Sequence, residues 1–153
     1  MVEEDWKAKI ITPRVSAAGI VESLDRKSIL IIERIYQPFG FAIPGGMMNV
    51  GETIEECAIR EVFEETNIVA DSIGLLAVFS HPDNDPRWHV VINYLVMQAV
   101  KDMEPTGRDD AKDAFWLKID ENNMWSKLTK SSHEIIRRYM TWRENEYELL
   151  KLE

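Results

Sequence analysis

The segment that most constrains this chain is a strongly acidic helix, predicted between residues 53 and 67. The fourteen residues from Glu52 to Glu65 include six glutamates and one arginine, a local charge of −5 within a net charge of −9. Thr53 followed by Glu56 forms a capping-box pattern, which satisfies free N–H groups at the start of a helix. Asn67 stands where helices often end in a left-handed residue, a conformation that asparagine tolerates well.

The two halves of this predicted helix differ in chemistry. At roughly 100° per residue, the carboxylates of Glu61, Glu64 and Glu65 fall within an arc of about 100° and can converge on one point. Arg60 is four residues from both Glu56 and Glu64, which places its guanidinium where it can orient them. The opposite half is apolar and consists of Ile54, Ala58, Ile59, Val62 and Phe63.

Two interpretations of the acidic face follow from the helix alone. Most runs of charge are solvated surface, and Glu61 with Glu65 is a like-charge pair that destabilises a helix by roughly 0.2–0.5 kcal/mol. A divalent cation would reverse that effect, since hard Mg²⁺ binds carboxylate oxygens together with substrate phosphates and water. The helix by itself leaves a metal site and a solvated face equally open.

The residues around the helix add a pattern with fixed spacing. Gly46 is followed after five residues by Glu52, and after a further seven by the run from Arg60 to Ile68, Arg-Glu-Val-Phe-Glu-Glu-Thr-Asn-Ile. This pattern closely resembles the Nudix box, in which a glycine and a glutamate precede an Arg-Glu-aliphatic-any-Glu-Glu core and a final Gly-aliphatic pair. Every charged position matches. The departure is Asn67, which keeps the backbone option of the glycine that the family usually has there.

The resemblance implies a fold and a chemistry for the chain. The expected fold class is α/β, a Nudix-type α/β/α sandwich around a mixed sheet, with residues 1–153 forming a single domain. The catalytic set includes Arg60, which would orient the glutamates, and a carboxylate that deprotonates the attacking water, either Glu52 or an acid from a later loop. The implied cofactor is Mg²⁺ or Mn²⁺, and the implied metal-binding residues are Gly46, Glu61, Glu64 and Glu65.

Periodicity outside the box predicts the sheet and a second helix. The run Ile29–Ile32 is apolar on both faces, so the strand that contains it should be central and covered on both sides. A long amphipathic helix near the end of the sequence, capped by Ser131 or Ser132, should cover the sheet. The predicted strands are residues 15–21, 28–35, 73–80, 88–100 and 113–119, and the second helix is 131–150. Periodicity alone indicates no more than the α/β class.

Candidate substrate-binding residues lie before and after the box. Arg34 ends a predicted strand, and Phe41 belongs to an aromatic loop, where it either packs under the loop or stacks on a nucleotide base. Gly46 lets the backbone pass close to a metal or a phosphate. Arg87 either clamps a phosphate bidentately or pairs with a neighbouring loop aspartate.

Two later segments resemble ADP-ribose pyrophosphatase-type members of the family. A loop stiffened by two prolines keeps their Asp-Pro-Arg-any-His core at residues 85–89. Residues 109–116 are similar to their Asp-Asp-Ala-any-any-Ala-any-Trp pattern. Asp109, Asp110 and Asp113 are therefore either solvated loop acids or candidates for an extra acid near the metal, and Asp110 is assigned to the catalytic set.

Composition narrows the class of protein. A net charge of −9 argues against a nucleic-acid partner, and it leaves a phosphate-bearing small substrate open if a metal supplies the positive charge. The single cysteine, Cys57, excludes an internal disulfide, favours the cytoplasm and is expected to be a small, partly buried filler. No apolar run approaches the ~20 residues of a membrane span, and the N-terminus is too polar for a signal peptide. Residues 1–13 remain open as an arm, an edge strand or a contact in a homodimer.

These patterns together predict a metal-dependent hydrolase of a nucleoside diphosphate linked to another moiety. ADP-ribose, cleaved to AMP and ribose 5-phosphate, is the leading substrate because of the resemblance at residues 85–89. An alternative in the same class is hydrolysis of a nucleoside triphosphate or an oxidised nucleotide. An alternative of another class is a non-catalytic ADP-ribose sensor. The sensor is disfavoured because every acid of the box is kept and 153 residues leave no room for a second, DNA-binding domain.

Overall fold

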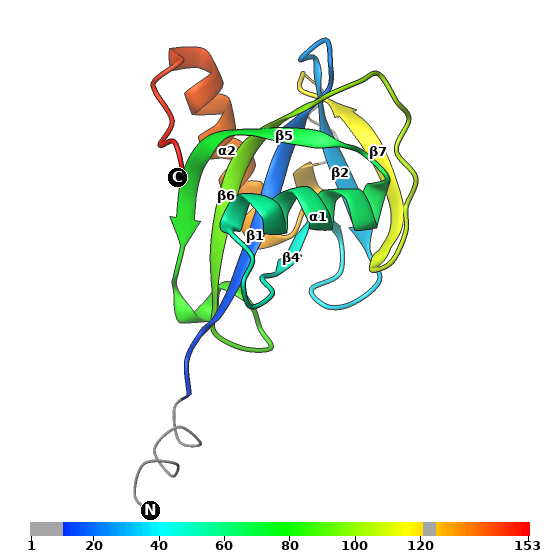
Figure 1. Cartoon of the computed structure of the whole chain (residues 1–153). Coiled ribbons are helices and arrows are strands. Elements are labelled where there is room, and N and C mark those ends of the chain that lie inside the picture. The colour runs from blue at the N-terminus through cyan, green and yellow to red at the C-terminus, as the bar shows by residue number, and fades with distance from the viewer. Residues whose placement is uncertain (1–10, 121–124) are drawn as a thin grey trace, which may run out of the picture.

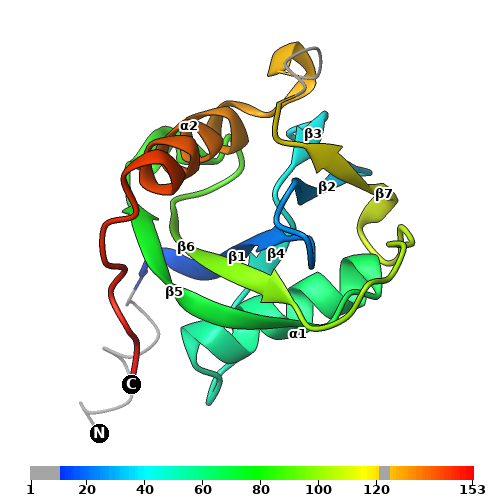
Figure 2. The ribbon, with the colours of Figure 1, turned by 90° about the horizontal axis from the view of Figure 1, so that it is seen from above.

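The computed structural model describes residues 11–120 and 125–153. One mixed sheet of seven strands lies between two helices, which cover its opposite faces (Figures 1 and 2). The predicted α/β class and the three-layer arrangement are confirmed. Residues 1–10, for which an arm, an edge strand or a dimer contact was open, lie outside the described part of the chain. Within the described ranges, no helix is long and apolar enough to cross a membrane.

The sheet is built around β1, which pairs with three other strands. The order of the sheet is β3-β2-β1-β6-β5, with β4 paired to β1 and β7 paired to β2. β1 and β6 run parallel, and the remaining pairs run antiparallel. The bounds are β1 (Arg14–Glu22), β2 (Ser28–Arg34), β3 (Phe41–Ala42), β4 (Gly45–Met47), α1 (Ile54–Thr66), β5 (Ala70–Phe79), β6 (Val90–Ala99), β7 (Ala111–Lys118) and α2 (Lys130–Asn145), with 3₁₀ turns at Pro82–Asn84 and Trp125–Lys127.

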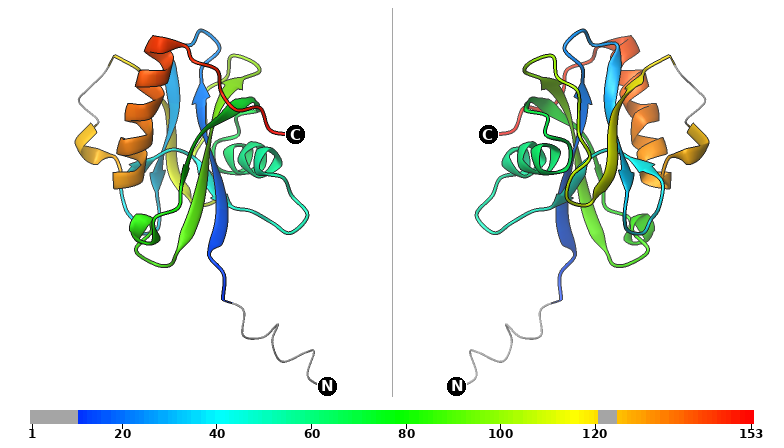
Figure 3. Two further views of the ribbon diagram at one scale, coloured as in Figure 1. Left: turned by 90° about the vertical axis from the view of Figure 1, so that its left-hand side faces the viewer. Right: turned by 90° about the vertical axis from the view of Figure 1, so that its right-hand side faces the viewer.

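Alternate side chains of the central strands point to opposite faces of the sheet and pack into two separate hydrophobic cores. Ile20 and Ile31 pack beneath α2, whereas Val21 and Leu30 pack beneath α1. This alternation follows from the two-residue period of a strand, and it explains why the run Ile29–Ile32 is apolar throughout. No residue of that run is more than 2% exposed, so the prediction of a strand covered on both faces is confirmed. Figure 3 shows the two helices on either side of the sheet.

Helix α1 begins and ends as its sequence predicts. The N–H of Glu56 donates to Thr53 Oγ1 at 3.1 Å, and the N–H of Thr53 donates to Glu56 Oε2 at 2.8 Å, which completes the capping box. Asn67 adopts the left-handed conformation with φ of 61°, and its N–H donates to the carbonyl of Phe63 at 2.9 Å.

The buried face of α1 differs from the predicted apolar half. Phe63 is 43% exposed, and its ring lies 5.0 Å from the guanidinium of Arg108. Cys57 and Glu65 are buried instead, at 0% and 3% exposure. The helix packs against β4 as well as β1, and the Cys57 thiol contacts the carbonyl of Gly46 at 3.5 Å. Cys57 is therefore a buried filler, as predicted, whereas the burial of Glu65 was not foreseen.

Several strand boundaries differ from the predicted ones because pairing extends them or ends them. β5 begins at Ala70, which pairs with Ala99, rather than at residue 73. β7 begins at Ala111, which pairs with Arg34, rather than at residue 113. β6 begins at Val90 rather than at residue 88. The two short strands β3 and β4 were not predicted at all.

Helix α2 is shorter than predicted at its C-terminal end. It starts after Thr129 rather than at Ser131 or Ser132, and Thr129 Oγ1 donates to Ser132 Oγ at 2.9 Å. It ends before Glu146, which adopts φ of 49°. The following segment runs along the free edge of β5, where the N–H of Leu75 donates to the carbonyl of Leu150 at 2.8 Å.

Candidate active site

A cavity of about 330 Å³ opens where the sheet meets α1 and the loops that precede β6, β7 and α2. Its lining contains both acids and bases, and it brings together six of the ten residues that the sequence singles out. These six are Arg34, Gly46, Glu61, Glu65, Arg87 and Asp110. The other four are Phe41, Glu52, Arg60 and Glu64, and the structure does not place them in the lining.

Gly46 and Glu61 form the first wall of the cavity. A Cβ atom at Gly46 would lie 2.4 to 2.6 Å from the carboxylate atoms of Glu61, so a side chain at this position would displace that carboxylate. Burial raises the pKa of Glu61, although its hydrogen bond with Arg60 acts in the opposite direction. The Pro-Gly-Gly lead-in therefore serves to bring β4 against the acidic face of α1.

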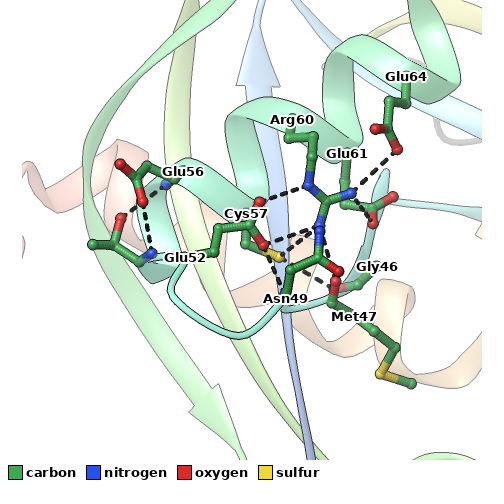
Figure 4. Close-up of polar contacts among 10 residues, drawn as sticks. Gly46, Met47, Asn49, Glu52, Glu56, Cys57, Arg60, Glu61 and Glu64 are labelled. Carbon is green, nitrogen blue, oxygen red and sulfur yellow. Dashed lines mark hydrogen bonds and ion pairs between the residues drawn. The ribbon is translucent and has the colours of Figure 1, made fainter.

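Arg60 binds three glutamates at once (Figure 4). Its Nε and Nη2 donate to the two carboxylate oxygens of Glu52 at 2.6 and 3.0 Å. Its Nη1 donates to Glu61 at 2.7 Å and to Glu64 at 3.2 Å. The hydrogen bond from Arg60 lowers the pKa of Glu52 to about 2. Glu56, the other partner predicted for Arg60, is instead used by the capping box of the helix.

Glu65 is the buried acid of the site. Its Oε2 atom has no hydrogen-bond partner among the described residues. Burial raises the pKa of Glu65 to about 9, and Glu61 and Asp110 act in the same direction, whereas Arg34 opposes them. A desolvated carboxyl group with an unsatisfied oxygen and acidic neighbours is unfavourable when ionised, unless positive charge compensates it.

A loop that the sequence left without structure holds this end of α1. The N–H groups of Thr106 and Arg108 each donate at 2.9 Å to carbonyls of the last helical turn, those of Thr66 and Glu65. The guanidinium of Arg108 donates to the carbonyl of Phe63. These bonds satisfy carbonyls that a helix end leaves free, and they hold Asp110 beside Glu65.

The basic side of the cavity comes from two arginines. Arg87 donates to Asp85 through Nε at 3.0 Å and Nη2 at 2.8 Å, which is the pairing with a loop aspartate that the sequence left open. Arg87 also lines the cavity, and its role as a phosphate clamp stays a prediction. Within the described part of the chain, the Arg34 guanidinium donates to the backbone carbonyls of Tyr36 and Gln37, at 3.4 and 3.3 Å. Burial lowers the pKa of Arg34, and the charge of Arg87 adds to this effect.

Two exposed aromatic residues line the cavity: Trp88, which the sequence did not assign to the site, and Tyr36, from the aromatic loop weighed as a rim for a nucleotide base. Trp88 lines the cavity, and the guanidinium groups of Arg14 and Arg87 lie 4.1 and 4.8 Å from its ring. Tyr36 also lines the cavity and is 59% exposed. Phe41 instead packs edge-on against Phe115, with ring centroids 5.2 Å apart, which is the packing role weighed for it. The signal for Trp88 was its position next to Arg87 in the loop motif.

The predicted convergence of three carboxylates is not present as the side chains stand. Across residues 11–120 and 125–153, no group of three His, Cys, Asp or Glu side chains is arranged to hold a metal ion. The reason lies with Glu64, which is 44% exposed and is held by Arg60 outside the cavity. The donor chemistry nevertheless fits a hard divalent cation, because carboxylates of Glu61 and Glu65 line one cavity and one Glu65 oxygen is unsatisfied.

The fold and the cavity bring acidic and basic side chains together at one end of α1. Residues 13–140 match the family model described as NUDIX domain, and the chain therefore belongs to the NUDIX family. It is 41% identical over 133 residues to the ADP-ribose pyrophosphatase of Methanocaldococcus jannaschii. The aligned residues cover 86% of this chain and 75% of that relative. The chain is thus a Nudix pyrophosphohydrolase.

Solved structures share the fold. A NUDIX hydrolase from Nitrosomonas europaea has a TM-score of 0.79 at 22% identity, covering 94% of this chain and 78% of the other. A bifunctional NMN adenylyltransferase/ADP ribose pyrophosphatase from Francisella tularensis, complexed with AMP and a Mn ion, has a TM-score of 0.73 at 28% identity. That match covers 92% of this chain but only 44% of the larger protein.

Proposed function

We propose that this chain hydrolyses the pyrophosphate bond of a nucleoside diphosphate linked to another moiety, with Mg²⁺ or Mn²⁺ as cofactor and ADP-ribose as the leading substrate. The observation that carries the proposal is the unsatisfied, buried carboxyl of Glu65 in a cavity that also contains Arg34 and Arg87. The choice of ADP-ribose is supported by the relative from Methanocaldococcus jannaschii and by the motif at residues 85–89.

Glu61 and Glu65 would hold the cation, together with Glu64 and the carbonyl of Gly46. When bound, the cation supplies positive charge to the phosphate oxygens and Lewis acidity toward water. Arg60 is a positioning residue in this scheme, because it fixes Glu61 without lining the cavity. Glu64 would leave its longer contact with Arg60, 3.2 Å, to reach the cation. Glu52 in turn fixes Arg60 through two hydrogen bonds.

The two arginines would bind the phosphates of the substrate. Arg87 is already oriented by Asp85, so little conformational entropy is lost when it engages a phosphate oxygen. Arg34 is partly desolvated and is repelled by Arg87. A diphosphate between the two guanidinium groups would remove that repulsion and accept charge-assisted hydrogen bonds from both.

The hydrolysis itself requires one proton acceptor from the chain. Water attacks one phosphorus, the bond from that phosphorus to the bridging oxygen breaks, and two phosphomonoesters leave. Asp110 lines the cavity and is the carboxylate that we assign to receive the proton of the water. Glu52, the other candidate, is a poor acceptor because Arg60 occupies both of its oxygens and holds its pKa at about 2.

The test is a panel of substrates assayed with Mg²⁺, with Mn²⁺ and with a chelator. The panel contains ADP-ribose, other nucleoside diphosphate-linked compounds, the canonical nucleoside triphosphates and an oxidised triphosphate. We expect ADP-ribose to give AMP and ribose 5-phosphate in equal amounts, with the highest kcat/KM and only with a divalent cation. A higher kcat/KM for a triphosphate would select the alternative substrate class. Binding of ADP-ribose without turnover under any metal condition would overturn hydrolysis in favour of the sensor.

A further inference from the structure

A second cavity, of about 450 Å³, adjoins the first. It lies between the end of β5, the 3₁₀ turn that follows β5, and the N-terminal half of α2. Figure 3 shows the 3₁₀ turn below the start of α2. Asn84 and Ser131 line both cavities, so the two cavities are neighbours. Six of the ten candidate site residues line the first cavity, and none of the ten lines the second.

The lining of the second cavity is positively charged within a chain of net charge −9. Lys130 and Arg138 contribute permanent cations, and Glu134 is the carboxylate of the lining. Glu134 is shared by Arg138 and Arg137, whose nitrogen atoms lie 3.4 and 3.5 Å from its oxygens. The Arg138 guanidinium lies 5.0 Å from the ring of Phe79, a contact that holds it at the wall.

Two histidines add neutral hydrogen-bonding groups to this lining. His81 and His133 both line the cavity. Nδ1 of His81 accepts from the N–H of Asp83 at 3.2 Å, so the neutral ring carries its proton on Nε2 and has a donor left for a ligand. Cations together with N–H donors are the chemistry that recognises phosphate groups.

The size of the first cavity gives a reason for a second one. Its 330 Å³ is near the lower end of the ~300–1,000 Å³ typical of small-molecule sites. A nucleoside diphosphate joined to a second moiety is a large ligand, and part of it must lie beyond the diphosphate-binding arginines. The adjoining cavity is open to that part.

We propose that the second cavity binds an additional phosphomonoester on a nucleoside diphosphate-linked substrate. The inference rests on the proposed function for the placement of the diphosphate in the first cavity. The extra phosphate can sit on the nucleoside or on the other moiety, and Lys130 and Arg138 bind it in either case. The protein then accepts phosphorylated derivatives of ADP-ribose and binds them more tightly than ADP-ribose itself.

The experiment compares dissociation constants measured by titration calorimetry on the whole chain, without added divalent cation so that no hydrolysis occurs. The ligands are ADP-ribose, ADP-ribose 2′-phosphate and ADP-ribose 1″-phosphate, which place the phosphate on opposite ends of the molecule. We expect at least one phosphorylated ligand to bind about fivefold more tightly than ADP-ribose, as ion pairs with two exposed cations allow. The ligand that gains identifies the end that occupies the second cavity.

Matched variants assign the gain to this cavity. Lys130→Gln with Arg138→Gln should abolish the difference between the ligands, and Lys130→Gln alone should reduce it. Lys127→Gln with Arg137→Gln is the control, since both side chains are exposed, Arg137 shares Glu134, and neither residue lines the second cavity. Equal affinity of all three ligands, or a gain that survives in the first double variant, would overturn the inference. Turnover of ADP-ribose with Mg²⁺ tests the proposed function separately, so the failure of one is distinguishable from the failure of the other.

Discussion

At the scale of single residues, Arg60 determines where the glutamates of the site stand. It holds Glu52 through two hydrogen bonds and Glu61 through a short one of 2.7 Å. Glu64 has the longest of these contacts, 3.2 Å, and is 44% exposed, so it is the carboxylate that can leave Arg60 most easily. A hydrogen bond to an exposed side chain contributes little to stability. Glu64 should therefore matter for activity far more than for folding.

The substitution Glu64→Gln tests this separation. It removes one charge with little change of volume, and we expect kcat to fall ~10²–10³-fold, the usual loss for one well-placed electrostatic group. Circular dichroism and the unfolding midpoint should be unchanged. Glu55→Gln is the control, because it makes the same change of charge in the first turn of the same helix, at a residue that belongs to no proposed metal-binding set. Near-normal turnover of a folded Glu64→Gln protein would remove Glu64 from the metal-binding set.

Arg87 gives a second test at this scale. Arg87→Ala should lower kcat/KM for ADP-ribose. The fall should correspond to a loss of transition-state stabilisation of ~1.5–3 kcal/mol, the range for a lost hydrogen bond to a charged group. The loss arises because a phosphate contact disappears and Asp85, its partner at 2.8 Å, adds negative charge next to the substrate. Steady-state kinetics measure the effect, with Arg137→Ala as an exposed control. If the two variants have the same kcat/KM, Arg87 serves the loop alone.

At the scale of elements, α1 shows which parts of the structure could be read from the sequence. Its start and end were predicted because the capping box and the left-handed Asn67 are interactions between residues at most four apart. The burial of Glu65 depends on packing against distant strands, and helical periodicity cannot reveal it. The carbonyls at the end of α1 accept hydrogen bonds from Thr106 and Arg108, some forty residues later in the chain. The position of Asp110 beside this helix end therefore could not be predicted from the helix sequence.

The left-handed end of α1 makes a stability prediction. Asn67→Gly should change the free energy of unfolding by less than ~1 kcal/mol, because relief of strain is offset by the greater entropy of the unfolded chain. Asn67→Val should destabilise by more than ~1 kcal/mol, since a β-branched residue resists the φ of 61° found here. Urea denaturation of the three proteins measures both changes. Equal stability of the valine and glycine variants would contradict a left-handed cap at this position.

At the scale of the whole molecule, the net charge of −9 and the acids around Glu65 are two parts of one electrostatic problem. A chain with this charge attracts any cation weakly, but only a cation held at a defined site stabilises the fold by linkage. The pKa of Glu65, raised to about 9, shows that ionisation is unfavourable at this carboxyl group, so a bound cation has the largest effect there. Binding of Mg²⁺ should therefore be visible in the stability of the whole chain without any substrate.

We accordingly expect Mg²⁺ to raise the unfolding temperature of the protein. At a concentration of about 100 times the dissociation constant the gain is ~2.7 kcal/mol, which corresponds to a shift of about 5–10 °C for a chain of this size. Differential scanning calorimetry measures the shift against NaCl of equal ionic strength, which screens charge without filling the site. Glu65→Gln should lose the Mg²⁺-specific shift, and Glu55→Gln, the same substitution in the first turn of the same helix, should keep it. An equal Mg²⁺ shift in the wild type and both variants would show that Glu65 does not bind the cation.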